Sequence, residues 1–208
     1  MRRIRIGVLA SGGGTNLQAI IDACERGEID GEVVVVISNV PEAYALERAR
    51  THRIPAFAFP HKGMTREDHE KDLMECLTQH QVDLIALAGY LRMMTPVFID
   101  KYAGRIMNTH PALLPSFGGK DMHGLKVHQA VIDYGCKVSG CTIHFVTADV
   151  DGGPIILQKA VPVLEDDTAE TLQERILKEE HKLFPRAIQL FAQGKLKIEG
   201  RRVRVLET

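Results

Sequence analysis

Several features that mark other classes of protein are missing from this chain of 208 residues. It has no tryptophan, and aromatic residues make up only 5% of it, so a large core must consist mainly of aliphatic side chains. The formal net charge is -1, without the basic excess of a nucleic-acid-binding surface. The longest apolar runs are too short to cross a bilayer, and the first residues lack the apolar core of a signal peptide. We therefore expect a cytoplasmic protein that binds neither nucleic acid nor membrane.

Motifs for metal and nucleophile chemistry are also missing. His123 and His128 are poorly spaced for two ligands on one helix face, and no His-Glu-x-x-His or Gly-x-Ser-x-Gly sequence occurs. No two cysteines have the close spacing of zinc or redox motifs, so we expect buried, reduced thiols. These cysteines are Cys24, Cys76, Cys136 and Cys141. The sequence therefore predicts no bound metal and no covalent nucleophile.

Short apolar runs alternate with helical stripes through the first half of the chain. After the apolar run 4–10, for example, Leu17, Ile20 and Cys24 recur at helical spacing. The pattern predicts strands at 4–10, 33–38, 55–59, 82–88 and 105–109, with helices between them. Thr65 is expected to cap one helix, with Asp68 completing a capping box, and Pro96 to open another. This alternation predicts a parallel sheet covered by helices on both faces.

The second half of the chain is less regular. We expect helices at 123–134 and 168–192, strands at 138–146 and 155–163, and a closing hairpin whose turn is Glu199-Gly200. Adjacent strands and a hairpin indicate a mixed sheet. The predicted fold is therefore α/β, with a mostly parallel sheet, helices on both faces, and a C-terminal helix plus hairpin. We expect residues 1–208 to form a single domain.

A glycine-rich turn, residues 11–16, lies between the first strand and the first helix. Glycines there allow a ligand to approach the backbone, and free N–H groups at a helix start attract phosphate. The dinucleotide motif would need a third glycine at Leu17, and the triphosphate loop would need Gly-Lys-Ser/Thr. The turn therefore favours a phosphomonoester over NAD or ATP, although such turns also occur without a ligand. Thr15 and Asn16 either contact the ligand or cap the helix.

Two other segments carry chemistry-bearing side chains. Asn108 and His110 end a predicted strand and point to one side of it, because side chains alternate along a strand. Asparagine can donate to a developing oxyanion, and histidine can transfer a proton near neutral pH. Asp151 lies in an Asp-Gly-Gly loop between two later strands. Such loops are also common as plain turns. If its carboxylate reaches His110, it favours the protonated imidazole. Without a nucleophile or metal, this set suits direct acyl transfer.

The chain resembles the folate-dependent formyltransferase family, in particular the members that act on glycinamide ribonucleotide. The resemblance covers nearly the whole length, and rests on segments 11–20, 88–94, 108–115, 144–146 and 151–156, with Glu180-His181. It implies a Rossmann-like formyltransferase fold, with a phosphate-binding half (1–110) and a folate-loop and C-terminal half (111–208). It also implies 10-formyltetrahydrofolate as co-substrate and glycinamide ribonucleotide as acceptor, and leaves a homodimer open.

The resemblance also implies roles for individual residues. The catalytic residues are Asn108, His110 and Asp151. The ribonucleotide is bound by Gly13, Gly14, Thr15, Asn16 and Glu180. The folate side is formed by Arg66, Leu91, Arg92, Met93, Met94, Asn108, Thr147 and Asp151.

The expected reaction is attack of the substrate amine on the formyl carbon. Asn108 would stabilise the oxyanion, His110 would act as the acid, and Asp151 would raise the pKa of His110 and relay protons. The segment 116–126 is longer than in the shortest relatives. Bordering the site is one alternative for part of it, and a surface loop is the expectation for Lys120, Asp121 and His123. The alternatives are hydrolysis of formyltetrahydrofolate and a non-catalytic binder of phosphorylated metabolites or folates.

Overall fold

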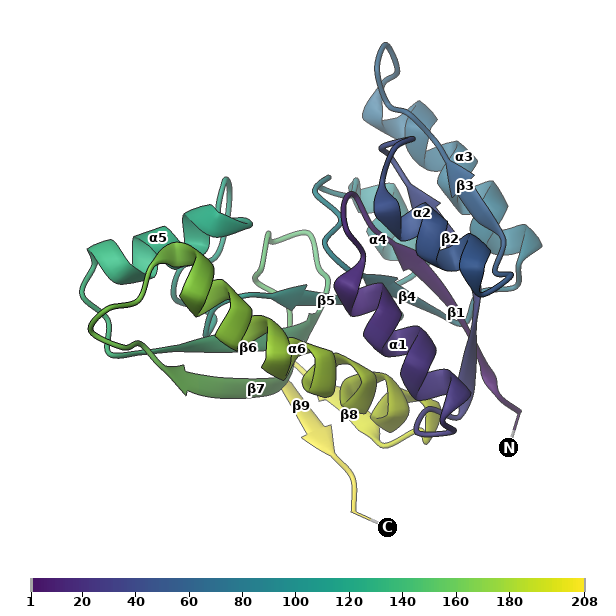
Figure 1. Ribbon diagram of the computed structural model, residues 1–208. Coiled ribbons are helices and arrows are strands. Elements are labelled where there is room, and N and C mark those ends of the chain that lie inside the picture. Colours follow the sequence, from purple (N-terminus) through teal and green to yellow (C-terminus); the bar gives the residue numbers. More distant parts are fainter. Residues whose placement is uncertain (1, 208) are drawn as a thin grey trace.

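The computed structural model describes residues 2–207, and strands and helices alternate in its first half (Figure 1). The first half contains β1 (Ile4–Leu9), α1 (Thr15–Glu25), β2 (Gly31–Ser38), α2 (Tyr44–Thr51), β3 (Ala56–Ala58), α3 (Arg66–Gln79), β4 (Leu84–Leu87), α4 (Pro96–Lys101) and β5 (Ile106–His110). The second half contains α5 (Leu125–Asp133), β6 (Val138–Phe145), β7 (Ile155–Pro162), α6 (Ala169–Ala192), β8 (Leu196–Glu199) and β9 (Arg202–Val205).

All these strands join one nine-stranded sheet in the order β3-β2-β1-β4-β5-β6-β7-β9-β8. The pairs from β3 to β5 are parallel, whereas β6 is antiparallel to both β5 and β7. The terminal hairpin joins the sheet through a parallel contact between β7 and β9. The mixed, mostly parallel sheet expected from the sequence is therefore confirmed.

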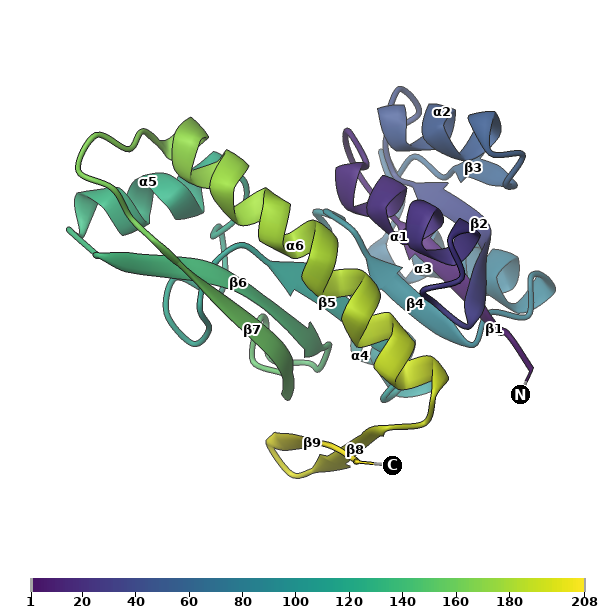
Figure 2. The same ribbon diagram turned by 60° about the horizontal axis from the view of Figure 1, so that its bottom comes forward.

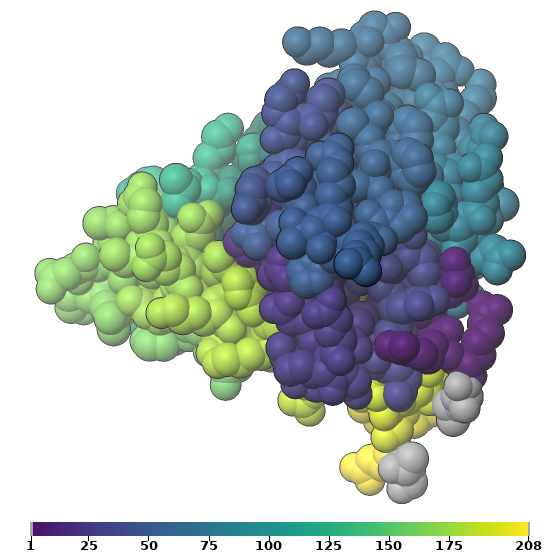
Figure 3. Space-filling model, turned by 45° about the vertical axis from the view of Figure 1, so that its right-hand side comes forward, coloured from purple at the N-terminus to yellow at the C-terminus, as the bar shows by residue number. Residues whose placement is uncertain are grey.

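Helices cover both faces of this sheet because side chains alternate along each strand. Val8 and Ala86 face a core built with α1, α2 and α6, whereas Leu9 and Ile85 face a second core built with α3 and α4. Over β6 and β7, α5 and α6 lie on the same side (Figure 2). The space-filling view shows α6 packed against the N-terminal segment (Figure 3).

Most local signals have the expected effect, with small shifts. Thr65 caps α3 by accepting from the Asp68 N–H, but the Asp68 carboxylate accepts from the Thr65 hydroxyl, so the expected capping box is wrong in its second bond. The closing turn is Gly200-Arg201, one position later than predicted, because Glu199 still pairs with Arg202. The helix expected from residue 123 begins at Leu125, because Gly124 has a φ of 57°.

The cysteines are free thiols, as expected, and Cys24, Cys76 and Cys141 are buried, but Cys136 is only half-buried, contrary to the prediction. Burial raises the pKa of Cys24 and of Cys76 to about 11. Thiols with such values are poor nucleophiles at neutral pH. Within residues 2–207, no helix is both long and apolar enough to cross a membrane.

Candidate active site

A cavity of about 500 Å³ lies at the carboxyl ends of the parallel strands. The chain leaves β1 toward β2 on one side, while β4 lies on its other side, and ligands of open α/β sheets bind at such a switch in strand order. Ser11 joins the two strand ends there: its N–H donates to Gly89, 3.0 Å away, and its hydroxyl accepts from the Leu91 N–H at 3.0 Å. The cavity is lined by segments 89–94, 108–111, 119–124 and 146–151 and by one face of α6.

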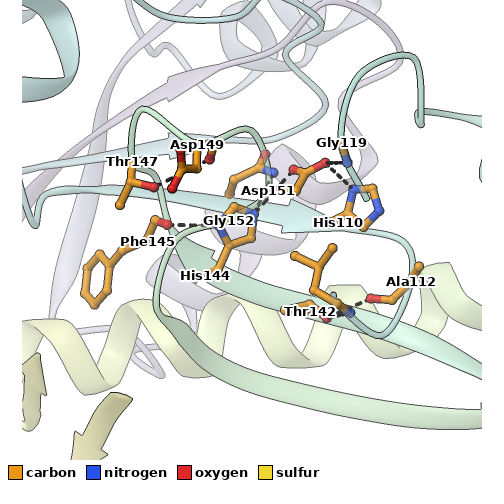
Figure 4. Close-up of polar contacts among 12 residues, drawn as sticks. His110, Ala112, Gly119, Thr142, His144, Phe145, Thr147, Asp149, Asp151 and Gly152 are labelled. Carbon is orange, nitrogen blue, oxygen red and sulfur yellow. Dashed lines mark hydrogen bonds and ion pairs between the residues drawn. The ribbon is translucent and has the colours of Figure 1, made fainter. Parts of the chain in front are cut away.

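His110 and Asp151 meet in this cavity. Nδ1 of His110, at the end of β5, lies 3.5 Å from Oδ2 of Asp151, in the loop between β6 and β7 (Figure 4). Nε2 of His110 donates to the Phe117 carbonyl at 2.8 Å, so in the neutral ring Nδ1 is the nitrogen without a proton. The basic nitrogen of His110 therefore faces a carboxylate.

The two side chains shift each other's titration. Burial lowers the pKa of His110, and this effect exceeds the opposing influence of Asp151, which raises it. Burial would raise the pKa of Asp151, but the protonated forms of His144 and His110, together with the Gly119 N–H, lower it. Asp151 therefore acts on His110 in the expected direction, but without substrate the net shift favours neutral His110, contrary to the protonated form that we expected.

The loop that carries Asp151 has little conformational freedom. Asp151 has a φ of 52°, and its Oδ2 accepts from the Gly119 N–H at 2.9 Å. A Cβ atom on Gly153 would lie 1.7 Å from the Phe145 carbonyl oxygen, so only glycine fits where this loop returns to β7. The two glycines that follow Asp151 thus allow the tight turn that directs its carboxylate back to His110.

The glycine-rich turn leaves the start of α1 open. Gly14 is the residue before the helix, with a φ of 71°, and no side chain caps the first turn. The carbonyls of Gly12 and Gly13 point to α2, where they accept from the Ala45 N–H at 3.0 Å and from Arg48 Nε at 2.7 Å. Of the two possibilities for Thr15 and Asn16, capping is therefore excluded, and both lie inside the helix. Arg48, which sequence reasoning missed, also lines a second hollow with Thr15 and His181.

Asn16 and Glu180 link this turn to the main cavity. The Asn16 side-chain amide donates to Glu180 Oε2 at 2.8 Å, and both residues line the cavity that holds Asn108 and His110. Glu180 is 5% exposed, and burial raises the pKa of its carboxyl against the opposing bond from Asn16. Oδ1 of Asn16 is buried and has no partner within residues 2–207. The pair therefore places a hydrogen-bonded amide and carboxyl group at the wall of the cavity.

The residues expected on the folate side are mostly, but not all, in this cavity. Its lining includes Thr147 and the whole segment 91–94, in which Leu91 and Met93 are exposed. Arg66 is exposed at the first turn of α3 and does not line it. Lys120, Asp121 and His123 are on the surface, as expected, but they also border the cavity, so their segment belongs to the site.

Two buried histidines of the cavity were given no role from the sequence. His144 lies opposite Asn108 on β6, where the alternation of its strand could have indicated its direction. His128 lies on α5, and burial lowers its pKa to about 4. No group of three or more potential metal-ligating side chains occurs in the described part of the chain.

Comparison with known proteins gives consistent matches. Residues 4–188 match the family model described as formyl transferase. The chain is similar to phosphoribosylglycinamide formyltransferase of Escherichia coli, with 41% identity over 94% of this chain and 90% of that protein. It is also similar to the crystal structure of glycinamide ribonucleotide transformylase 1 from Symbiobacterium toebii, with 52% identity, a TM-score of 0.94, and coverage of 99% and 95%. A formyltetrahydrofolate deformylase from Pseudomonas syringae has 25% identity and a TM-score of 0.90, over 99% of this chain and 66% of that one.

Proposed function

Because this chain belongs to the formyl transferase family, within which it groups with the phosphoribosylglycinamide formyltransferases, we propose that it formylates glycinamide ribonucleotide in purine synthesis, with 10-formyltetrahydrofolate as the donor. The observation that carries this proposal is the shared cavity. It joins an acyl-transfer set, Asn108, His110 and Asp151, to Asn16 at the open start of α1. A substrate that carries both an amine and a phosphate suits such a cavity.

The ribonucleotide phosphate would bind at the turn 13–16. The uncapped first turn of α1 offers N–H groups and the positive end of the helix dipole. Arg48 fixes the turn through Gly13 and adds a positive charge beside it. Glu180 would then accept a hydrogen bond from the glycinamide part, or pair with its amine before attack.

The donor would bind on the other side of the cavity. The backbone of segment 147–151 offers polar groups to the pterin ring, and the apolar side chains of Leu91, Met93 and Met94 offer contact surface. Arg92 lies in the same wall and can pair with a carboxylate of the donor. Because Arg66 lies outside the cavity, its expected contact with the donor requires a ligand that extends beyond the cavity rim.

The reaction requires one proton to move from the attacking amine to the leaving folate nitrogen. The amine attacks the formyl carbon, the bond from this carbon to the folate nitrogen breaks, and Asn108 donates to the oxyanion formed between these steps. His110 begins neutral and takes up the amine proton at Nδ1, directly or through Asp151 and water. Asp151 stabilises the imidazolium, which then protonates the leaving nitrogen.

Hydrolysis of the donor is the second candidate, and the similarity to a deformylase is the observation that favours it. In that reaction water would replace the amine in the same cavity. The open start of α1 would then have no ligand to bind, whereas the ribonucleotide phosphate accounts for it.

One assay separates these functions. The purified protein is incubated with 10-formyltetrahydrofolate, with and without glycinamide ribonucleotide, and loss of the donor is followed by absorbance. Loss that depends on the ribonucleotide, with the formylated product confirmed by mass, would support the transferase. Equal loss without it would establish the hydrolase, and binding of both ligands without turnover would indicate a binding protein.

A further inference from the structure

Asn108 and His144 are directly opposite each other in the antiparallel pair of β5 and β6. Nδ2 of Asn108 lies 3.2 Å from Nε2 of His144, and the His144 side chain is 2% exposed. The His144 side of this contact is buried, and an unpaired buried polar atom costs about 1–3 kcal/mol. The protonation of the imidazole therefore determines which way the Asn108 amide faces.

The hydrogen-bond partner of the other ring nitrogen, Nδ1, shows which nitrogen of neutral His144 carries the proton. Nδ1 lies 2.9 Å from the carbonyl oxygen of Phe145 (Figure 4). A carbonyl oxygen can only accept, so Nδ1 must carry the proton. In the neutral ring, Nε2 is then a hydrogen-bond acceptor.

An acceptor at Nε2 selects one orientation of the Asn108 amide. Only the NH₂ end of the amide can donate to it, because the opposite orientation would bring a carbonyl oxygen against a nitrogen lone pair. One N–H of Asn108 is used by His144, and the other is left for a ligand in the cavity. The orientation that His144 selects is thus the one that presents a donor to a developing oxyanion.

His144 also faces Asp151. Its Nε2 lies 3.7 Å from Oδ1 of Asp151, whose Oδ2 is held by the Gly119 N–H. Nε2 could donate to this carboxylate only if His144 were doubly protonated, and it would then no longer accept from Asn108. Neutral His144 therefore accepts a hydrogen bond from Asn108, whereas protonated His144 would donate one to Asp151.

We propose that His144 is a positioning residue, which in its neutral Nδ1–H form fixes the Asn108 side chain with one N–H directed at the formyl oxygen. This inference rests on the proposed function, since it assigns a role within the same site. In this proposal His144 acts through Asn108 rather than on either substrate directly. Its removal should therefore affect turnover and leave substrate binding nearly unchanged.

A double-mutant cycle tests this coupling. His144→Leu should lower kcat on the order of 10-fold or more, as for loss of part of an oxyanion donor's effect, with both KM values nearly unchanged. His144→Gln, whose side-chain oxygen can accept from Asn108, should recover part of the loss. In an Asn108→Ala background, His144→Leu should have no further effect, because its target is gone. Equal losses in both backgrounds would overturn the proposal.

His128 provides a matched control, as a second buried histidine of the cavity. The effect of His128→Gln, whatever its size, should persist in the Asn108→Ala background. If the effect of His128→Gln also disappeared in the Asn108→Ala background, coupling to Asn108 would not be specific to His144, and the proposal would fail.

A measurement without turnover keeps the proposal testable if the transferase assay fails or His144→Leu does not fold. Nitrogen-15 NMR of the wild-type protein above pH 7.5, a value chosen about one unit above the ordinary histidine pKa, should show His144 as the Nδ1–H tautomer. An Nε2–H tautomer would overturn the proposal. Absence of ribonucleotide-dependent transfer would instead overturn the proposed function.

Discussion

Oδ2 of Asp151 lies 3.5 Å from Nδ1 of His110, so a carboxylate from the loop after β6 faces the basic nitrogen of a histidine at the end of β5. The negative charge raises the pKa of His110, but burial lowers it by more. This balance gives His110 a neutral resting form with a carboxylate already placed to stabilise its protonated form. The pair can therefore take up a proton and release it within one turnover.

Replacing Asp151 tests this relationship. In Asp151→Asn the influence that raises the His110 pKa is lost while burial remains, so the pKa should fall further. The acid limb of kcat/KM, which reports the free enzyme, should move to lower pH, and kcat should fall by roughly 10²–10⁴-fold. The measurement is the pH profile of both parameters, and a profile that stays in place would contradict the coupling.

Asn108 is expected to act on the transition state. Asn108→Ala should lower kcat by roughly 10²–10³-fold, corresponding to about 3–4 kcal/mol from one oxyanion donor. The residue is half-buried at the cavity, so the melting temperature should change little. Steady-state kinetics and a thermal melt check this together. Near-normal turnover in a folded variant would exclude the role.

Arg48 should act through the phosphate of the ribonucleotide. Arg48→Met removes the bond to Gly13 and a charge beside the turn, and should raise KM for the ribonucleotide by roughly 10-fold or more, as for loss of a charge-assisted hydrogen bond. KM for the folate donor should stay constant. Arg50→Met is the matched control, because Arg50 is exposed on the same helix and pairs with Glu47. Equal effects of the two substitutions would place the phosphate elsewhere.

The buried carboxyl group of Glu180 leads to a prediction about the pH dependence of stability as well as about binding. Burial raises the pKa of its carboxyl in the folded state, so ionisation is unfavourable there. Stability should therefore decrease as pH rises from the unfolded pKa to the higher folded pKa, and Glu180→Gln should remove this decrease. Thermal melts between pH 4 and 8 compare the two proteins, a range chosen to begin near the ordinary glutamate pKa of about 4.3. The same variant should also bind the ribonucleotide more weakly. If the melting temperatures of the two proteins changed with pH in the same way, the raised pKa of Glu180 would be contradicted.

The order of strands and helices follows from local patterns in the sequence. Apolar runs such as 33–37 can be buried on both faces only inside a helix-covered sheet, and Thr95 followed by Pro96 favours the start of a helix through local backbone preferences alone. The same alternation places Asn108 and His110 on one side of β5. The errors in the predicted helix and strand boundaries lie at element ends such as Gly124 and Gly200, where the backbone angles of a single residue determine where the element begins or ends.

The composition of the site depended on contacts between distant segments. Nothing in the spacing of Asn16 and Glu180 shows that they share a hydrogen bond, and nothing local shows that Arg66 lies outside the cavity or that His123 borders it. The resemblance to a family implied roles for several residues, but not the tautomer of His144 or the net pKa shift of His110.

The sequence by itself determined the fold class, the position of the glycine-rich turn and the two strand-end side chains, because periodicity and backbone preferences act over a few residues. Only the tertiary structure decided that the side chains of Asp151, His110, His144 and Asn108 meet in one polar cluster. The physical reason is that both burial, which lowers the pKa of His110, and the carboxylate that opposes it come from parts of the chain remote in sequence. These contacts exist only once the sheet has brought the strand ends together.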